Sequence, residues 1–213
     1  DLPLADATNA TLVLTNIHPL RAGNCRAVVY NSAGSVLSDA AELKIRIPAT
    51  IVQQPVSITT NLGRAVTLTV SAVGTGTLRY QWRFNGSALA AGINASLTFT
   101  NVQPIHAGNY AVTVTDDIGP ITSAPATLVV LVDPLVTQAP LSQTVVAGAN
   151  VTLSVSVTNN ATLPVGYRWR RNGQYITNGS FVLNQTTCFF TVTNAQPQFT
   201  QYAVVLTNAA RPL

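Results

Sequence analysis

The chain repeats a motif of its own at a nearly fixed spacing, and this feature constrains the fold more than any other. Residues 16–30, which begin Asn-Ile-His-Pro-Leu-Arg-Ala-Gly-Asn, are similar to residues 101–115 and, more loosely, to residues 194–207. The copies begin 85 and then 93 residues apart. A second pair, residues 80–86 and 167–173, shares Tyr-x-Trp-Arg-x-Asn-Gly and is separated by 87 residues. Such periodicity is typical of tandem domains built on one plan.

Each copy consists of short alternating segments that predict β-strands. In residues 66–70 the apolar side chains fall on one face and the threonines on the other, and in residues 79–83 aromatic residues alternate with polar ones. Asn-Gly at 85–86 and again at 172–173 favours a tight hairpin turn, because both residues of that turn need positive φ angles. Glu and Lys, which favour helices, occur once each. We therefore expect an all-β fold.

Two aromatic positions recur in step with the repeat. Trp82 and Trp169 occupy one shared position, and Tyr110 is matched by Tyr202 at the other, within a segment that reads Ala-Gly-Asn-Tyr-Ala-Val in the middle copy. With these residues the chain resembles bacterial-type, intermediate-set-like immunoglobulin repeats of secreted and surface proteins. The resemblance implies tandem immunoglobulin-like antiparallel β-sandwiches, with the tryptophans on strand C and the tyrosines at the tyrosine corner of strand F. This fold hosts many unrelated functions, so it does not by itself indicate one.

The chain departs from the family at its inter-sheet cysteine pair. Val70 and Val112 stand at those positions in the middle copy, Val155 and Val204 in the last, and Cys25 replaces the corner tyrosine of the first. Losing a native disulfide typically costs about 2–5 kcal/mol, which apolar side chains filling the same space partly offset. We expect these two cores to be held by packing alone.

Aligning the copies divides the chain into three parts. Residues 1–47 are expected to supply strands E, F and G of one domain, residues 48–131 a complete domain, and residues 132–213 a domain without its last strand. Two interpretations stay open. The chain is either cut from a longer array, or its first and last parts complete each other between molecules by strand addition.

No catalytic, cofactor-binding or metal-binding motif is recognisable, so we expect a non-enzymatic protein without a cofactor. His18 and His106 lie in equivalent connections and are interpreted as loop residues. Asp116 and Asp117, with Asp133 at the following domain junction, are the only acidic cluster of the middle copy. Calcium needs 6–8 oxygen ligands, so a polar turn is favoured over a calcium site.

The two cysteines, Cys25 and Cys188, lie in different copies and cannot form an intradomain disulfide. Free cysteine behaves as a small apolar residue, which favours two buried thiols. The alternative is a link between chains or to another repeat.

Surface features give two further candidate groups of residues. Arginines recur along strand C and predict a solvated face or a basic docking stripe for an acidic polysaccharide or a neighbouring subunit: Arg79, Arg83, Arg168, Arg170 and Arg171. Seven Asn-x-Ser/Thr triplets are candidate glycosylation sites, of which Asn85 and Asn178 are expected in turns: Asn9, Asn85, Asn94, Asn150, Asn160, Asn178 and Asn184.

The low charge content guides the functional hypothesis. Charged residues make up only 8% of the chain, although exposed sheet edges are usually protected by charges. Assembly with neighbouring repeats or copies would cover those edges, and glycans would help. We therefore predict an extracellular or cell-surface structural or adhesive array, such as a fibre, surface layer or adhesin shaft, of bacterial or archaeal origin. No membrane span is present, and the net charge of +4 is too thinly spread to indicate nucleic acid binding.

Two alternative functions are weighed beside this one. The first is a spacer or carbohydrate-binding module of a larger secreted enzyme, for which Tyr175 and Phe181 are the only candidate platform residues. The second is an adhesion receptor of animal type, which the missing cysteine pairs disfavour.

Overall fold

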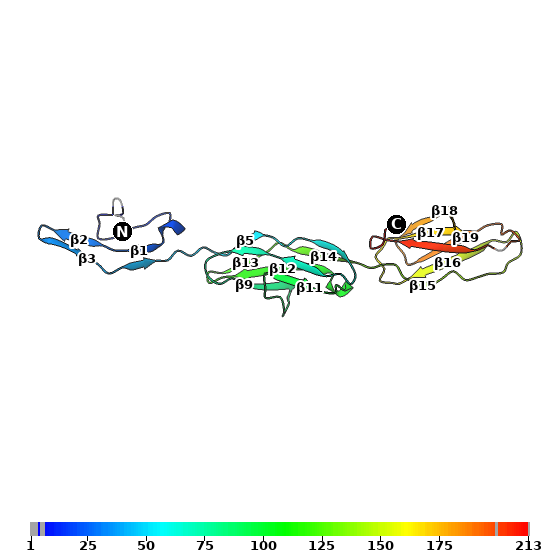
Figure 1. Cartoon of the computed structure of the whole chain (residues 1–213), viewed down its shortest axis with the longest axis horizontal. Helices are drawn as coiled ribbons and strands as arrows, with labels where there is room; N and C mark the ends of the chain where they lie inside the picture. The colour runs from blue at the N-terminus through cyan, green and yellow to red at the C-terminus, as the bar shows by residue number, and fades with distance from the viewer. Residues whose placement is uncertain (1–3, 5–6, 199, 213) are drawn as a thin grey trace.

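The expected all-β fold is confirmed. A computed structural model describes residues 4, 7–198 and 200–212, and in Figure 1 the strands form three groups that follow one another along the long axis. The helical content of these described residues is limited to two single 3-10 turns, η1 (Pro19–Arg21) and η2 (Pro104–His106).

The first group holds four short strands. These are β1 (Gly23–Cys25), β2 (Val28–Asn31), β3 (Gly34–Leu37) and β4 (Ala41–Leu43). β1 pairs with β4 and β2 with β3, both antiparallel, as expected of strands F and G. Residues 7–18, where strand E is expected, contain no strand. In the middle group the corresponding strand E is β11, which pairs with strand B, β7. The described part of the first group has no such partner strand.

The middle group is a two-layered sandwich. Its strands are β5 (Thr50–Gln53), β6 (Ile58–Asn61), β7 (Val66–Thr69), β8 (Ser71–Val73), β9 (Arg79–Phe84), β10 (Ser87–Ala88), β11 (Ser96–Phe99), β12 (Gly108–Thr115), β13 (Pro120–Thr122) and β14 (Ala126–Leu131). One sheet runs β10-β9-β12-β14-β6, with β13 also on β12, and β7 pairs with β11 and β5 with β8 in the facing layer. β6 and β14 are parallel, whereas the other pairs are antiparallel.

The middle core forms around the strand C tryptophan. Trp82 is fully buried, and both Val70 and Val112 belong to its cluster, so valines do fill the space of the missing cysteines. Tyr110 is also buried, with its ring 5.0 Å from that of Phe84. A hydrophobic cluster of this kind supplies the main driving force for folding.

The last group is a second sandwich of two three-stranded sheets. Its strands are β15 (Val136–Gln138), β16 (Val151–Val157), β17 (Val165–Arg171), β18 (Gln174–Leu183), β19 (Thr187–Val192) and β20 (Tyr202–Thr207). The sheets run β15-β16-β19 and β18-β17-β20. Tyr167, Trp169, Val155 and Cys188 are all fully buried between them, and Val204 packs against this cluster.

The Asn-Gly turns behave as the sequence predicts. Asn85 and Gly86 have φ angles of 47° and 87°, and Asn172 and Gly173 have 49° and 84°. In both sandwiches the asparagine of this turn also holds strand F (β12 or β20) in place. Its Oδ1 accepts the Asn109 N–H at 2.9 Å in the middle sandwich and the Gln201 N–H at 2.9 Å in the last one. The turn therefore also positions strand F, which lies beside strand C (β9 or β17) in the sheet.

Candidate functional site

Reciprocal hydrogen bonds hold the segments that join one repeat to the next. At the entry of the middle sandwich, the Ile47 N–H donates to Oγ1 of Thr75 at 2.7 Å, and the Thr75 N–H donates back to the Ile47 carbonyl at 3.0 Å. At the entry of the last sandwich, Val132 and Thr162 make the same reciprocal pair at 2.7 and 3.0 Å. Each connecting segment is thus hydrogen-bonded to the loop between strands B and C of the following domain, which joins β8 to β9 in the middle sandwich and β16 to β17 in the last one.

Asp116 supports the entry of the middle sandwich from the turn after strand F. Its Oδ1 accepts the N–H groups of Ile118 and Gly119 at 2.8 and 2.9 Å, and its Oδ2 accepts the Ala49 N–H at 2.7 Å. These backbone donors, that of Gly119 foremost, hold the pKa of the buried Asp116 carboxyl below its ordinary value. The carboxylate therefore ties the turn to the connecting segment, and this accounts for it without a calcium ion.

Asn208 takes the place of Asp116 in the last sandwich, and its chemistry is inverted. The residue aligned with Ala49 is Pro134, which has no N–H to donate. The Asn208 Nδ2 instead donates to the carbonyls of Val132 and Thr162 at 2.7 and 2.9 Å. Its Oδ1 accepts two N–H groups of its own turn, both at 3.0 Å. An aspartate at position 208 could not donate to these carbonyls, and with Pro134 in the connecting segment it would also lack the N–H that Asp116 accepts from Ala49. An asparagine therefore suits a connecting segment that contains a proline here.

One hydrogen bond crosses directly between the two sandwiches. The Asn61 Nδ2, at the end of β6, donates to the Ala210 carbonyl in the last sandwich at 3.0 Å. Ala210 and Val132 are both buried at this junction, 8% and 7% exposed. The second junction is therefore packed as well as hydrogen-bonded. Sequence reasoning missed these residues, although the alignment of Asp116 with Asn208 and of Ala49 with Pro134 contained the signal.

The two cysteines differ in their surroundings, and neither is in a disulfide. Cys188 lies on β19 with no exposed surface, and burial raises the pKa of its thiol. Because Cys188 has no exposed surface, a second thiol could reach it only if the last sandwich opened, and an interchain link of this residue stays a prediction. Cys25 is half-buried on β1, and the same hypothesis stays a prediction for it.

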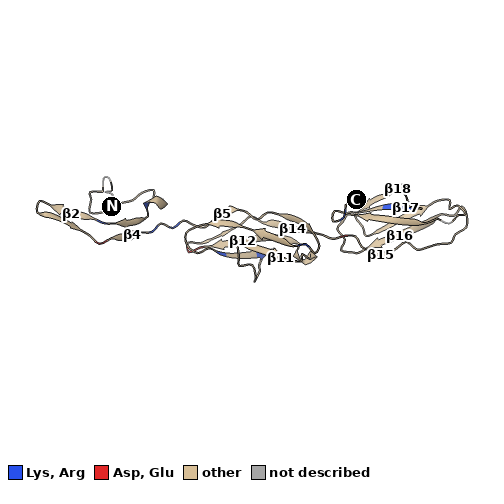
Figure 2. Ribbon diagram, viewed as in Figure 1, with Lys and Arg blue, Asp and Glu red and all other residues tan. Residues whose placement is uncertain are grey.

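The five arginines do not form one stripe. Arg79 and Arg83 are exposed on β9 of the middle sandwich, and Arg83 donates to the carbonyl of Gly86 at 3.2 Å. The other three lie on β17, where Figure 2 shows a basic segment. Arg168 aligns with Gln81 of the middle copy, so the arginines recur in the sequence without recurring at every position of the fold.

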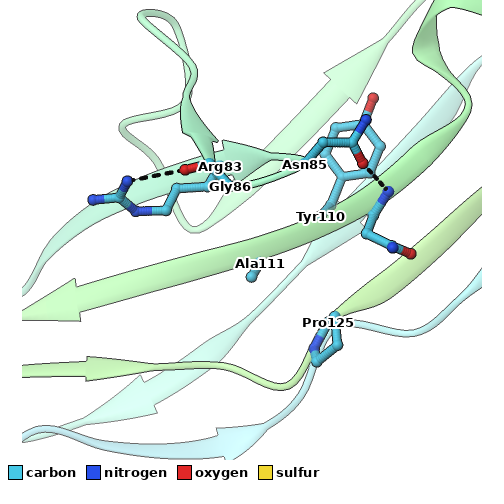
Figure 3. A pocket seen from close by; sticks show the side chains of 7 residues that line it. Arg83, Asn85, Gly86, Tyr110, Ala111 and Pro125 are labelled. Atoms are coloured by element: carbon cyan, nitrogen blue, oxygen red, sulfur yellow. Dashed lines mark hydrogen bonds between the residues drawn. The ribbon is translucent and has the colours of Figure 1, made fainter.

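All seven candidate glycosylation asparagines are exposed. Asn85 lies in its expected turn beside the shallow surface pocket of Figure 3, which Arg83, Gly86, Tyr110 and Pro125 help to line. Asn178 is instead within β18, because this strand runs for ten residues through the segment expected to turn. Their occupancy stays a prediction.

His106 and Phe181 pack against other side chains of their own sandwiches. His106 accepts the Gln103 N–H on its Nδ1 at 2.9 Å and packs on Phe99 with ring centroids 4.8 Å apart, whereas His18 is an exposed loop residue. Phe181 packs against the core of the last sandwich, so it offers no exposed platform. Among the described residues, no three His, Cys, Asp or Glu side chains are grouped to hold a metal ion.

The tyrosine corner identifies the type of β-sandwich. The Tyr110 hydroxyl donates to the His106 carbonyl at 2.7 Å, four residues upstream, beside the buried Trp82 on strand C. Residues 48–116 also match a family model described as immunoglobulin domain. The chain carries immunoglobulin-like domains. The I-band fragment I67–I69 from titin has the same fold as this tandem, with a TM-score of 0.73 and 16% sequence identity over 91% of this chain and 72% of that one.

The chain is similar to two proteins of an animal, Drosophila melanogaster. Protein sidekick of Drosophila melanogaster is 27% identical over 175 residues, which cover 78% of this chain and 8% of the relative. Neuroglian of the same species is 27% identical over 179 residues, or 82% of this chain and 14% of that protein. The chain thus spans a small part of the relatives it matches. The bacterial character implied by the sequence resemblance finds no support in these comparisons.

Neither the described side chains nor the relatives indicate catalysis. Within the part of the chain that the structure describes, no helix has the length and apolar character needed to cross a bilayer.

Proposed function

We propose that the chain belongs to an extracellular structural or adhesive array of immunoglobulin-like repeats that bears tension along its length. The parallel pairing of β6 and β14 carries this proposal. β6 follows the entry of the chain into the middle sandwich, β14 leads out of it, and they pair from Ile58 with Leu128 to Asn61 with Leu131. Tension would pull these two strands in opposite directions along their common axis. Their hydrogen bonds are then loaded together rather than one after another.

The junctions support the same function. A connecting segment that is clamped on both sides passes force from one sandwich to the next with little slack. The reciprocal pair of Val132 and Thr162, the two bonds from Asn208 and the bond from Asn61 to Ala210 all act at one junction. Four or more bonds at a buried site hold a defined orientation better than a flexible linker would.

Exposed apolar residues favour lateral contact between neighbouring repeats or copies. Val182 on β18 and Phe189 on β19 are 74% and 63% exposed, and few charges surround them in this sandwich. Exposed apolar surface of this kind is often covered by a partner. We therefore propose that the array binds neighbouring repeats or other copies of itself, and that glycans are further partners.

Single-molecule pulling of the full chain tests the load-bearing role. The Leu62 N–H extends the β6–β14 ladder by donating to the Leu131 carbonyl at 2.8 Å. Leu62→Pro removes this donor, whereas Leu62→Ala keeps it and serves as the matched control. We expect the proline variant to lower the unfolding force of the middle sandwich clearly more than the alanine variant does. Tyr110→Phe removes a hydrogen bond that is not part of this ladder, so it should change the equilibrium stability more than the force.

Two outcomes would overturn the proposal. One is a Leu62→Pro variant that unfolds at the wild-type force although it folds normally. The other is that the wild-type middle sandwich unfolds at the lowest force recorded for any part of the chain. The β6–β14 ladder would then add no mechanical resistance.

A further inference from the structure

A compact basic cluster lies on the outer face of the last sandwich. Arg168 and Arg170 alternate on β17 with the buried Tyr167 and Trp169, so their side chains share the face opposite the core. Tyr175 on β18 lies directly across from Arg170 in the antiparallel register. The guanidinium carbons of Arg168 and Arg170 are 3.9 and 4.1 Å from the centre of the Tyr175 ring. One tyrosine thus holds two cations close together.

The positive charge of this cluster is not compensated. Within the described residues the only salt bridge joins Lys44 to Glu42 in the first group. Residues 132–213 contain four arginines and a single acid, Asp133. Arg170 donates to the Tyr175 hydroxyl at 2.6 Å, but its buried Nε has no hydrogen-bond partner among the described atoms. A buried donor without a partner is costly, and two neighbouring cations repel each other.

The fold itself does not require the cluster. In the middle sandwich the positions of Arg168 and Tyr175 are held by Gln81 and Ala88. There Gln81 donates to the carbonyls of Trp82 and Leu89 at 2.9 and 2.8 Å, so the same face of strand C is satisfied internally. The last sandwich replaces this arrangement with two half-buried arginines and uncompensated charge, which points to a ligand rather than to packing.

We propose that Arg168, Arg170 and Tyr175 form a binding site for the sulfate or carboxylate groups of an anionic polysaccharide. Guanidinium groups bind such oxyanions through paired N–H donors, and an anion between the two arginines would relieve their repulsion. A hollow adjoins the cluster and is lined by Tyr175 itself, by Arg171 and Ile176, and by amide and hydroxyl side chains that can bond sugar hydroxyls: Asn172, Gln174, Thr177 and Asn178. The site lies beyond the load-bearing role proposed above and does not depend on it.

Titration calorimetry with defined probes tests the site. The full chain is produced in a host that adds no N-linked glycans, because a glycan on Asn178 would occupy the hollow. The probes are a heparin oligosaccharide, oligogalacturonate, neutral dextran and oligoglutamate. The test variant is Arg168→Gln with Arg170→Gln, and the matched control, Arg79→Gln with Arg83→Gln, removes the same charge from the middle sandwich. We expect the test variant to weaken heparin or galacturonate binding at least about tenfold, the control to change it less than about twofold, and dextran not to bind.

A second measurement keeps the test independent of variant folding. In wild-type protein labelled with 15N, the Nε–H signals of Arg168 and Arg170 should shift on adding heparin oligosaccharide, while those of Arg79 and Arg83 stay unchanged. Equal losses in the two double variants would overturn the site, because the attraction would then follow net charge alone. Absence of binding by both anionic glycans would also overturn it. Tighter binding of oligoglutamate would assign the cluster to an acidic peptide and so refute the polysaccharide.

Discussion

Replacing Asn208 by alanine should loosen the last sandwich at its junction. The side chain is 8% exposed and makes four hydrogen bonds, two donated to connecting-segment and loop carbonyls and two accepted from its own turn. Net contributions of about 0.5–1.5 kcal/mol per bond, reduced where water can enter, give a loss of about 2–4 kcal/mol in the free energy of unfolding. Asn208→Asp keeps the acceptor oxygen but has no N–H, so it should cost at least as much.

Thiol labelling of Cys188 measures this loss directly. The thiol is fully buried, so a reagent reaches it only when the last sandwich opens, and Cys25→Ser removes the other thiol. When reclosing is faster than labelling, the rate follows the opening equilibrium. A loss of 2–4 kcal/mol then speeds labelling about 30- to 700-fold.

Asn160→Ala is the control, because this asparagine is exposed in the same sandwich and should leave the rate unchanged. Labelling of Asn208→Ala within twofold of wild type would refute the reasoning, since the four bonds would then add nothing to stability.

Two further predictions concern the middle sandwich. The pKa of Asp116 is lowered in the folded state, so its stabilisation is fully present above the ordinary value of 3.8 and is lost as pH falls through the lower folded pKa. The urea concentration at the unfolding midpoint, followed by Trp82 fluorescence in a Trp169→Phe background, should therefore decrease as the pH is lowered below 3.8. Asp116→Asn should remove this part of the pH dependence. Tyr110→Phe should lower the free energy of unfolding by about 1 kcal/mol, as the hydroxyl loses its bond to the His106 carbonyl. An unchanged midpoint in urea would contradict the corner's stabilising role.

Local and repeated signals allowed most of the fold to be predicted from the sequence. The positive φ angles of Asn85 and Gly86 follow from residue type, and the burial of Trp82 with Val112 follows from alternation and repeat alignment. The turn expected at Asn178 is wrong, because β18 runs from Gln174 to Leu183, although its pairing with β17 is interrupted between Tyr175 and Ser180.

The junction could not be predicted in the same way, because its bonds join residues far apart in the chain. Asn208 and Val132 are 76 positions apart, and Asn61 and Ala210 are 149. Side-chain alternation reports which face of a strand is buried, but not which loop another domain touches. The division of the chain into domains at residues 47 and 131 likewise stays a prediction.

The repeats stand in a row that is held by hydrogen bonds at its junctions (Figure 1). Small-angle X-ray scattering of the full chain in dilute solution tests it most directly. A compact globule of 213 residues would have a radius of gyration of about 17 Å. We predict a value well above this, with the distance distribution of an elongated rod. A radius near 17 Å with a symmetric distribution would contradict the account.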